Sequence, residues 1–248
     1  MFFIIGVVTF ISEYLDSGLG MGYGTVLSSV LIIMGYHPLK VIPAILISQL
    51  VTDVAACISH HKLCNVNFEF KSPDFKIASI LGVISALGVI LSVVIALQIP
   101  RWLLTLYIGL LVFSMGILII VTVNKPVCFS WHKILGLSFL AAFNKGISGG
   151  GYGPLVMGGQ IISGVAPKNA IGITAFAEAV TCAIGFIIYL ILGRSIDYKL
   201  TGLLIVCALG AVPVAALTVK NISSSRIKRY VGVLISLLGF LTLLKINS

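Results

Sequence analysis

Charged residues are scarce in this sequence. They make up 9% of its 248 residues, whereas apolar residues make up 59%, and the mean hydropathy is +1.17. A soluble globular domain carries roughly 25% charged residues, because water must solvate its surface. The shortage excludes a cytosolic enzyme, a secreted domain and a disordered chain. It predicts an integral membrane protein whose main partner is the lipid bilayer.

Familiar catalytic and metal-binding patterns are also missing. The five cysteines are scattered, with no CxxC pair and no Cys/His metal spacing. There is no HExxH motif, no Walker loop and no Ser/His/Asp constellation, and His60 and His61 are expected in a solvated loop. The sequence therefore predicts no enzyme, no metal and no cofactor. Its 16 Lys and Arg residues lie between apolar runs, which favours membrane orientation over nucleic-acid binding.

Six apolar runs meet or approach the length of a membrane span. About 20 apolar residues cross the bilayer core as a helix, and lipid leaves an isolated open strand without hydrogen-bond partners. All six runs are therefore expected to be helices. The predicted spans are residues 41–59, 76–98, 102–123, 169–192, 200–219 and 227–244.

Four shorter apolar runs flank two glycine-rich breaks. Met1–Leu15 and Thr25–Gly35 flank the first break, and Trp131–Phe143 and Pro154–Gly164 flank the second. Helices of this length reach roughly 16 to 22 Å, which passes the midplane without a comfortable crossing. Residues 1–35 and 131–164 are therefore each predicted to form a helical hairpin that enters the membrane and returns. A single broken helix that spans the membrane is the alternative.

The two halves of the chain are related. A shift of 129 residues places Phe10–Ile58 on Phe139–Ile187 without a gap and matches a Gly-Tyr-Gly motif and a later Gly-x-x-Pro motif. The chain is therefore predicted to be all-α, with repeats at residues 1–124 and 125–248, each a hairpin plus three helices. Because three crossings are an odd number, the second repeat would enter from the opposite side. Such inverted repeats are common among secondary transporters.

The distribution of Lys and Arg predicts the orientation. If each broken segment is a hairpin, one side of the membrane holds roughly twice as many of these residues as the other, and this side is cytoplasmic by the positive-inside rule. If each broken segment crosses once, the two sides are nearly equal. The predicted location is the cell membrane, multi-pass, with both termini outside. Two full crossings per broken segment would give the same orientation.

The glycine breaks are candidate binding sites. Glycine allows tight turns and close approach, and the start of a helix offers free N–H groups and the positive end of its dipole. The expected ligand is therefore a small anion, although the glycines could instead serve close helix packing. The candidate substrate-binding residues are Gly20, Gly22, Tyr23, Gly24, Asn144, Lys145, Gly149, Gly150, Gly151, Tyr152 and Gly153.

Ionisable residues within apolar segments form a second group of candidates, because charge in the membrane is costly and must face protein or water. Lys145, which aligns with Asp16, either contacts the anion or pairs with Asp16 or Glu13. Glu178, which aligns with Gln49, either binds a coupling proton or stays neutral and hydrogen-bonded. Threonines in helices often bond their own backbone. The coupling candidates are Glu13, Asp16, Gln49, Thr52, Asp53, Glu178 and Thr181.

Motifs in both halves carry a family resemblance. They are Gly20–Gly24, Gly35, Pro38 and the polar stretch His61–Asn67, followed by Ser148–Pro154, Gly164, Pro167 and Gly172–Thr174. In these motifs the chain resembles the sulfite exporter TauE/SafE family of membrane transporters over nearly its whole length. It departs from the family pattern where Tyr23 and Tyr152 replace a glycine. The resemblance implies sulfite, a sulfonate or another small organosulfur anion as substrate.

These observations together predict a secondary transporter that moves a small anion across the membrane by alternating access. Its expected partner is the anion, a proton is one candidate coupling ion, and no nucleic acid is expected. A passive anion channel is the alternative, followed by a non-transporting membrane subunit or an intramembrane enzyme. The sequence leaves open the identity of the anion, the direction of transport and the oligomeric state.

Overall fold

The computed structural model describes residues 2–122, 131–162, 165–219 and 224–244. The predicted boundary between the repeats, at residues 124 and 125, lies outside the described residues. So do Met1, Val123 and Gly164, where predicted segments begin or end. All regular secondary structure within the described ranges is helical, as the sequence predicts.

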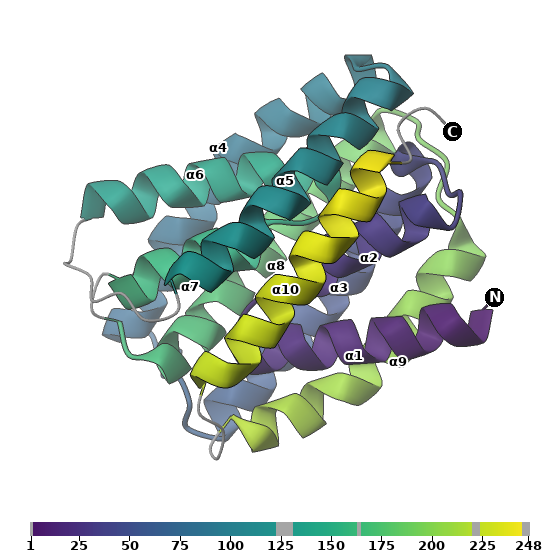
Figure 1. The fold of residues 1–248 in the computed structure, drawn as a ribbon. Helices are drawn as coiled ribbons and strands as arrows, with labels where there is room; N and C mark the ends of the chain where they lie inside the picture. Colours follow the sequence, from purple (N-terminus) through teal and green to yellow (C-terminus); the bar gives the residue numbers. More distant parts are fainter. Residues whose placement is uncertain (1, 123–130, 163–164, 220–223, 245–248) are drawn as a thin grey trace.

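Ten helices occupy these ranges (Figure 1). They are α1 (Phe2–Leu19), α2 (Tyr23–Ile33), α3 (Pro38–Lys62), α4 (Pro73–Gln98), α5 (Arg101–Thr122), α6 (Trp131–Ser148), α7 (Tyr152–Ile162), α8 (Pro167–Ile191), α9 (Tyr198–Thr218) and α10 (Ser224–Leu244).

Local sequence signals explain several helix starts. Proline occupies the first turn of α3, α4 and α8, where no N–H is needed. The side chains of Ser72 and Asp197 accept hydrogen bonds from the first turns of α4 and α9. These helices therefore begin two or three residues before the predicted spans, since a proline or a polar cap precedes each apolar run.

Five of the described helices are long and apolar enough to cross a membrane: α1, α3, α4, α8 and α9. The last four coincide with predicted spans. Helices α5 and α10 also lie at predicted positions, with shorter apolar stretches at Trp102–Ser114 and Gly232–Leu244 among the described residues. The chain is therefore a multi-pass membrane protein.

Helix α1 is longer than predicted. The sequence suggested that Met1–Leu15 is too short to cross, but α1 continues to Leu19 and is about 27 Å long. Its last turns carry Glu13 and also Asp16, which directly follows the predicted apolar run. Both side chains are buried within the protein, so their polarity does not end the helix.

Helices from the two halves pack against each other in related pairs. Helix α1 lies along α9, and α6 lies along α4 (Figure 1). In the same way, α3 packs on α9 and α8 packs on α4, while α3 and α8 contact each other. If five is added to each helix number, counting on from α10 to α1, the contact of α1 with α9 becomes that of α6 with α4. In the same way, the contact of α3 with α9 becomes that of α8 with α4. The first helix of each half therefore packs mainly on the other half.

Helices α5 and α10 form a close pair that runs along one face of the molecule (Figure 1, teal and yellow). Their contact depends on glycine. A Cβ added at Gly116 would overlap Ser236, and one added at Gly239 would overlap the backbone of Phe113. Small residues drive such packing in lipid, where association gains little from the hydrophobic effect.

We expect Gly116→Ala to lower the melting temperature of the detergent-purified protein. The added methyl group would force α5 and α10 apart, and overpacking of this kind costs about 1–3 kcal/mol. The matched control is Gly202→Ala in α9, where an added Cβ meets no atom within 4 Å. The control should melt at or above the wild-type temperature, since alanine is the better helix former. Equal melting temperatures for Gly116→Ala and wild type would contradict this packing.

Candidate functional site

The two glycine breaks touch each other inside the protein. The first break, residues 20–22, separates α1 from α2, and the second break, residues 149–151, separates α6 from α7. A Cβ added at Gly24 would overlap the carbonyl oxygen of Gly149, and one added at Gly153 would overlap the carbonyl oxygen of Gly20. The 129-residue shift relates these two contacts to each other. The breaks therefore meet backbone to backbone.

Glycine is required for the turn in both breaks. Gly20 and Gly22 have φ angles of 67° and 129°, and Gly149 and Gly151 have φ angles of 74° and 78°. Residues with a Cβ rarely adopt this region of backbone conformation. The first and third residues of each break therefore share the same requirement, a positive φ angle that glycine adopts readily.

Protein oxygens bond several of the N–H groups that the sequence suggested for an anion. The Tyr23 N–H donates to Asp16 Oδ1 at 3.3 Å, and the Gly151 N–H donates to Thr25 Oγ1 at 2.9 Å. The Gly150 N–H donates to Ser148 Oγ at 3.1 Å. The start of α2 thus already holds a carboxylate, the kind of group that a helix N-terminus favours.

The polar side chains around the breaks are also engaged. The hydroxyl of Tyr23 bonds Ser48, and the hydroxyl of Tyr152 bonds Ser85 at 2.8 Å. Asn144 accepts a hydrogen bond from Tyr107. These contacts connect the breaks to α3, α4 and α5. The spacing of residues along the chain did not predict these connections.

A buried polar network lies beside the breaks. The Lys145 ammonium is 2.8 Å from Glu178 Oε1 and also donates to Gln49. Gln49 Nε2 in turn donates to Glu178 Oε1 at 2.9 Å and to Asp16 Oδ2 at 3.0 Å. The network consists of two aligned pairs, Asp16 with Lys145 and Gln49 with Glu178. Residues that match across the repeat therefore converge in space.

The partner of Lys145 differs from the two that the sequence suggested. Its ion pair is with Glu178, and neither Asp16 nor Glu13 forms a salt bridge with it. The reason is geometric: the Gln49 amide bonds both Asp16 and Glu178, and it separates Asp16 from the lysine. The side chains of Lys145 and Glu178 are only 1% and 4% exposed, so each depends on the other for charge compensation.

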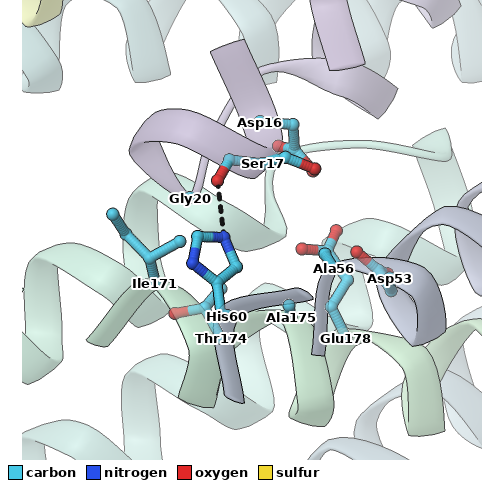
Figure 2. A pocket seen from close by; sticks show the side chains of 10 residues that line it. All are labelled: Asp16, Ser17, Gly20, Asp53, Ala56, His60, Ile171, Thr174, Ala175 and Glu178. Atoms are coloured by element: carbon cyan, nitrogen blue, oxygen red, sulfur yellow. Dashed lines mark hydrogen bonds between the residues drawn. The ribbon is translucent and has the colours of Figure 1, made fainter. Parts of the chain in front are cut away.

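A small cavity adjoins this network and is lined mainly by acidic and polar groups. Its volume is about 10 Å³, which is room for roughly one water molecule. Oxygens of Asp16, Asp53 and Glu178 all lie within 4.8 Å of one another. Figure 2 shows the carboxyl groups of Asp53 and Glu178 side by side, with that of Asp16 facing them from α1. The remaining lining residues are Ser17, Gly20, Ala56, His60, Ile171, Thr174 and Ala175.

His60 belongs to this cavity, and its predicted place in a solvated loop is wrong. Helix α3 continues to Lys62, so His60 lies in its last turn and is fully buried. Its Nε2 is 2.9 Å from the carbonyl oxygen of Ser17 (Figure 2), and its Nδ1 is 3.1 Å from Asn65 Nδ2. The adjacent histidines looked like a polar helix end, and it is tertiary packing that buries the first of them, with Ser17 of α1 and the α8 residues of the cavity beside its ring.

The remaining coupling candidates have different surroundings. Glu13 accepts a hydrogen bond from Ser17 at 2.6 Å through Oε1, while its buried Oε2 has no hydrogen-bond partner. The hydroxyls of Thr52 and Thr181 donate to the backbone carbonyls of Gln49 and Ala177 in their own helices. This is the local bonding expected of threonine within a helix.

Comparison with known proteins gives the family. The family model described as sulfite exporter TauE/SafE matches residues 4–242. The chain belongs to this family. It is also 25% identical over 200 residues to the "Probable membrane transporter protein YtnM" of Bacillus subtilis (strain 168), a match that covers 75% of this chain and 64% of that protein. The chain thus spans less than two thirds of this relative's length. No solved structure matches the chain.

The ion pair can be tested by a double-mutant cycle in this TauE/SafE protein. Lys145→Met and Glu178→Met should each destabilise the protein by about 3–5 kcal/mol, because each leaves an uncompensated buried charge. The double variant should lose much less than the sum of the two. Melting temperature and the yield of monodisperse protein in detergent provide the measurement. Strictly additive losses would show that the two side chains do not stabilise each other.

Proposed function

We propose that this protein is a secondary transporter for a small anion, with sulfite, a sulfonate or another organosulfur anion as substrate. The observation that supports it most is the backbone contact between the two glycine breaks, from which α2 and α7 begin. Two helix starts at one point provide N–H groups and positive dipole ends for one negative solute. The family description, sulfite exporter, supports the substrate class.

The proposed architecture is an inverted repeat. Matching pairs such as α1 on α9 and α6 on α4 support it, because each half contributes the same element to the other half. The two contacts between the breaks, Gly24 with Gly149 and Gly153 with Gly20, are likewise exchanged by the 129-residue shift. A twofold relation in the plane of the membrane would produce this exchange and would place the breaks near the midplane.

Alternating access then follows from separating the breaks. In the conformation described here they are closed on each other, and Asp16, Thr25 and Ser148 bond their N–H groups. Movement of one half against the other would open a path between the breaks. The anion would replace these protein oxygens as the acceptor, and Lys145 and Asn144 would lie next to it.

Transport can be measured in proteoliposomes with labelled sulfite, an alkyl sulfonate and a simple carboxylate. We expect saturable uptake of at least one of them, accelerated by the same unlabelled anion inside the vesicles. This acceleration requires a carrier whose site faces the two sides in turn. Uptake that is linear in concentration and shows no acceleration would indicate a passive channel. Failure of all three anions to move would refute the proposal.

The role of the breaks is tested by Gly150→Ala, measured on protein that elutes from size exclusion like the wild type. A Cβ at Gly150 would lie 2.6 Å from the Thr25 nitrogen, so the breaks could no longer close. We expect a fall of roughly tenfold in the rate of transport, equivalent to an increase of about 1.4 kcal/mol in the barrier. Gly202→Ala, which meets no neighbouring atom, should transport at the wild-type rate. Normal transport by Gly150→Ala would remove the breaks from the mechanism.

The proposed orientation places both termini outside and the α3–α4 connection in the cytoplasm. Cys64 lies exposed in that connection, whereas Ser195 lies exposed in the α8–α9 connection on the predicted outer side. A membrane-impermeant maleimide applied to intact cells should label Ser195→Cys, made in a background of Cys64→Ser and Cys128→Ser. In protein that retains Cys64, the same reagent should leave Cys64 unlabelled until the cells are opened. The reverse pattern would invert the topology.

A further inference from the structure

We propose that Asp16, Asp53 and Glu178 form a binding site for one monovalent cation of the sodium type. The three side chains come from α1, α3 and α8, and their oxygens lie within 4.8 Å of one another. They line a cavity of about 10 Å³, which has room for a group the size of one water molecule. Hard cations prefer oxygen ligands of this kind. The Thr174 side chain lines the same cavity, and its hydroxyl accepts a hydrogen bond from Gln160 at 2.8 Å.

An unpartnered carboxylate oxygen supports a ligand at this point. Asp53 is 3% exposed, and its buried Oδ2 has no hydrogen-bond partner. Figure 2 shows the Asp53 carboxyl group directed toward that of Glu178. A buried charge without a partner is costly, and buried charges in proteins are paired or coordinate ions. A cation between these carboxyl groups would provide the missing partner.

The hydrogen bonds favour a single positive charge. Glu178 is already paired with Lys145 at 2.8 Å, and Asp16 accepts from Gln49 and from the Tyr23 N–H. Asp53 is the one member of the trio for which the described residues leave a buried oxygen unbonded. The three carboxylates and the single Lys145 ammonium leave a net negative charge at the cavity, and the few oxygens that line it suit a monovalent ion better than calcium, which takes six to eight oxygens.

The site has a consequence for transport, and this step rests on the proposed function. Gly20 of the first break lines the same cavity as the three carboxylates. A free anion near the break would meet this negative charge at short range in a medium of low dielectric constant, where repulsion is strong. A bound cation would weaken the repulsion. Cation binding would thus favour anion binding, and the sodium gradient, rather than the proton suggested by the sequence, would drive transport.

Binding is tested on the purified protein in detergent, without any anion substrate. NaCl replaces choline chloride at constant ionic strength, and melting temperature is recorded along the series. A ligand that binds only the folded state raises apparent stability with concentration and saturates as the site fills. We expect a saturable rise of several degrees with sodium. Equilibrium binding of radioactive sodium should approach one ion per chain.

The decisive variant is Asp53→Asn, which keeps the side-chain shape and removes the charge. It should abolish the sodium-dependent rise and melt in choline chloride at or above the wild-type temperature. Glu69→Gln, which changes an exposed acidic residue in the α3–α4 connection, should keep the full rise. An Asp53→Asn protein whose melting temperature rises with sodium as much as that of the wild type would overturn the proposal.

The wild-type titration decides the question even if Asp53→Asn does not fold. Equal melting temperatures in sodium and choline would overturn the proposal. Stabilisation by calcium alone, or by acidification alone, would assign the site to a divalent ion or to protons and would also overturn it. Sodium binding in a protein that moves no anion would keep the cation site and refute the transport function. Sodium-independent anion transport would keep the transport function and refute its coupling to sodium.

Discussion

The structure depends on a contact between two pieces of backbone in the interior of a membrane protein. The first and second breaks come so close that Gly24 and Gly153 have no room for a side chain. Polar backbone in such a place must find partners within the protein, because lipid offers none. Side chains of Asp16, Thr25 and Ser148 provide some of them. The requirement for partners explains why polar residues collect beside the glycines.

The buried charges follow from the same contact. Asp16 lies near the end of α1 and Lys145 in the last turn of α6, so the meeting of the breaks brings both to the middle of the molecule. There Asp16 and Lys145 meet Gln49 of α3 and Glu178 of α8. The Gln49 amide connects the two charged side chains, because it bonds both Asp16 and Lys145. Acidic groups outnumber the lysine at this point. That excess is the reason a positive ligand fits the cavity while the nearby helix starts suit a negative one.

Much of the fold was predictable from local signals. The apolar runs predicted the positions of α3, α4, α8 and α9, since lipid restricts an apolar segment of that length to a helix. The glycine motifs predicted both breaks. Helix α1 ends four residues beyond the predicted run, because Asp16, which follows that run, is buried in the protein and does not end the helix. The burial of His60 was missed for a related reason, since polarity in a sequence does not reveal what packs over it.

Composition and periodicity alone predicted a helical membrane protein, and self-similarity alone matched the glycine motifs of the two halves, because all three are properties of the linear chain. The pairing of Lys145 with Glu178, and the cavity that Asp16, Asp53 and Glu178 share, are visible only in the folded molecule. These residues lie on different helices, far apart along the chain. Their distances depend on how α1, α3, α6 and α8 cross, and helix crossing is set by side-chain packing across the whole interior.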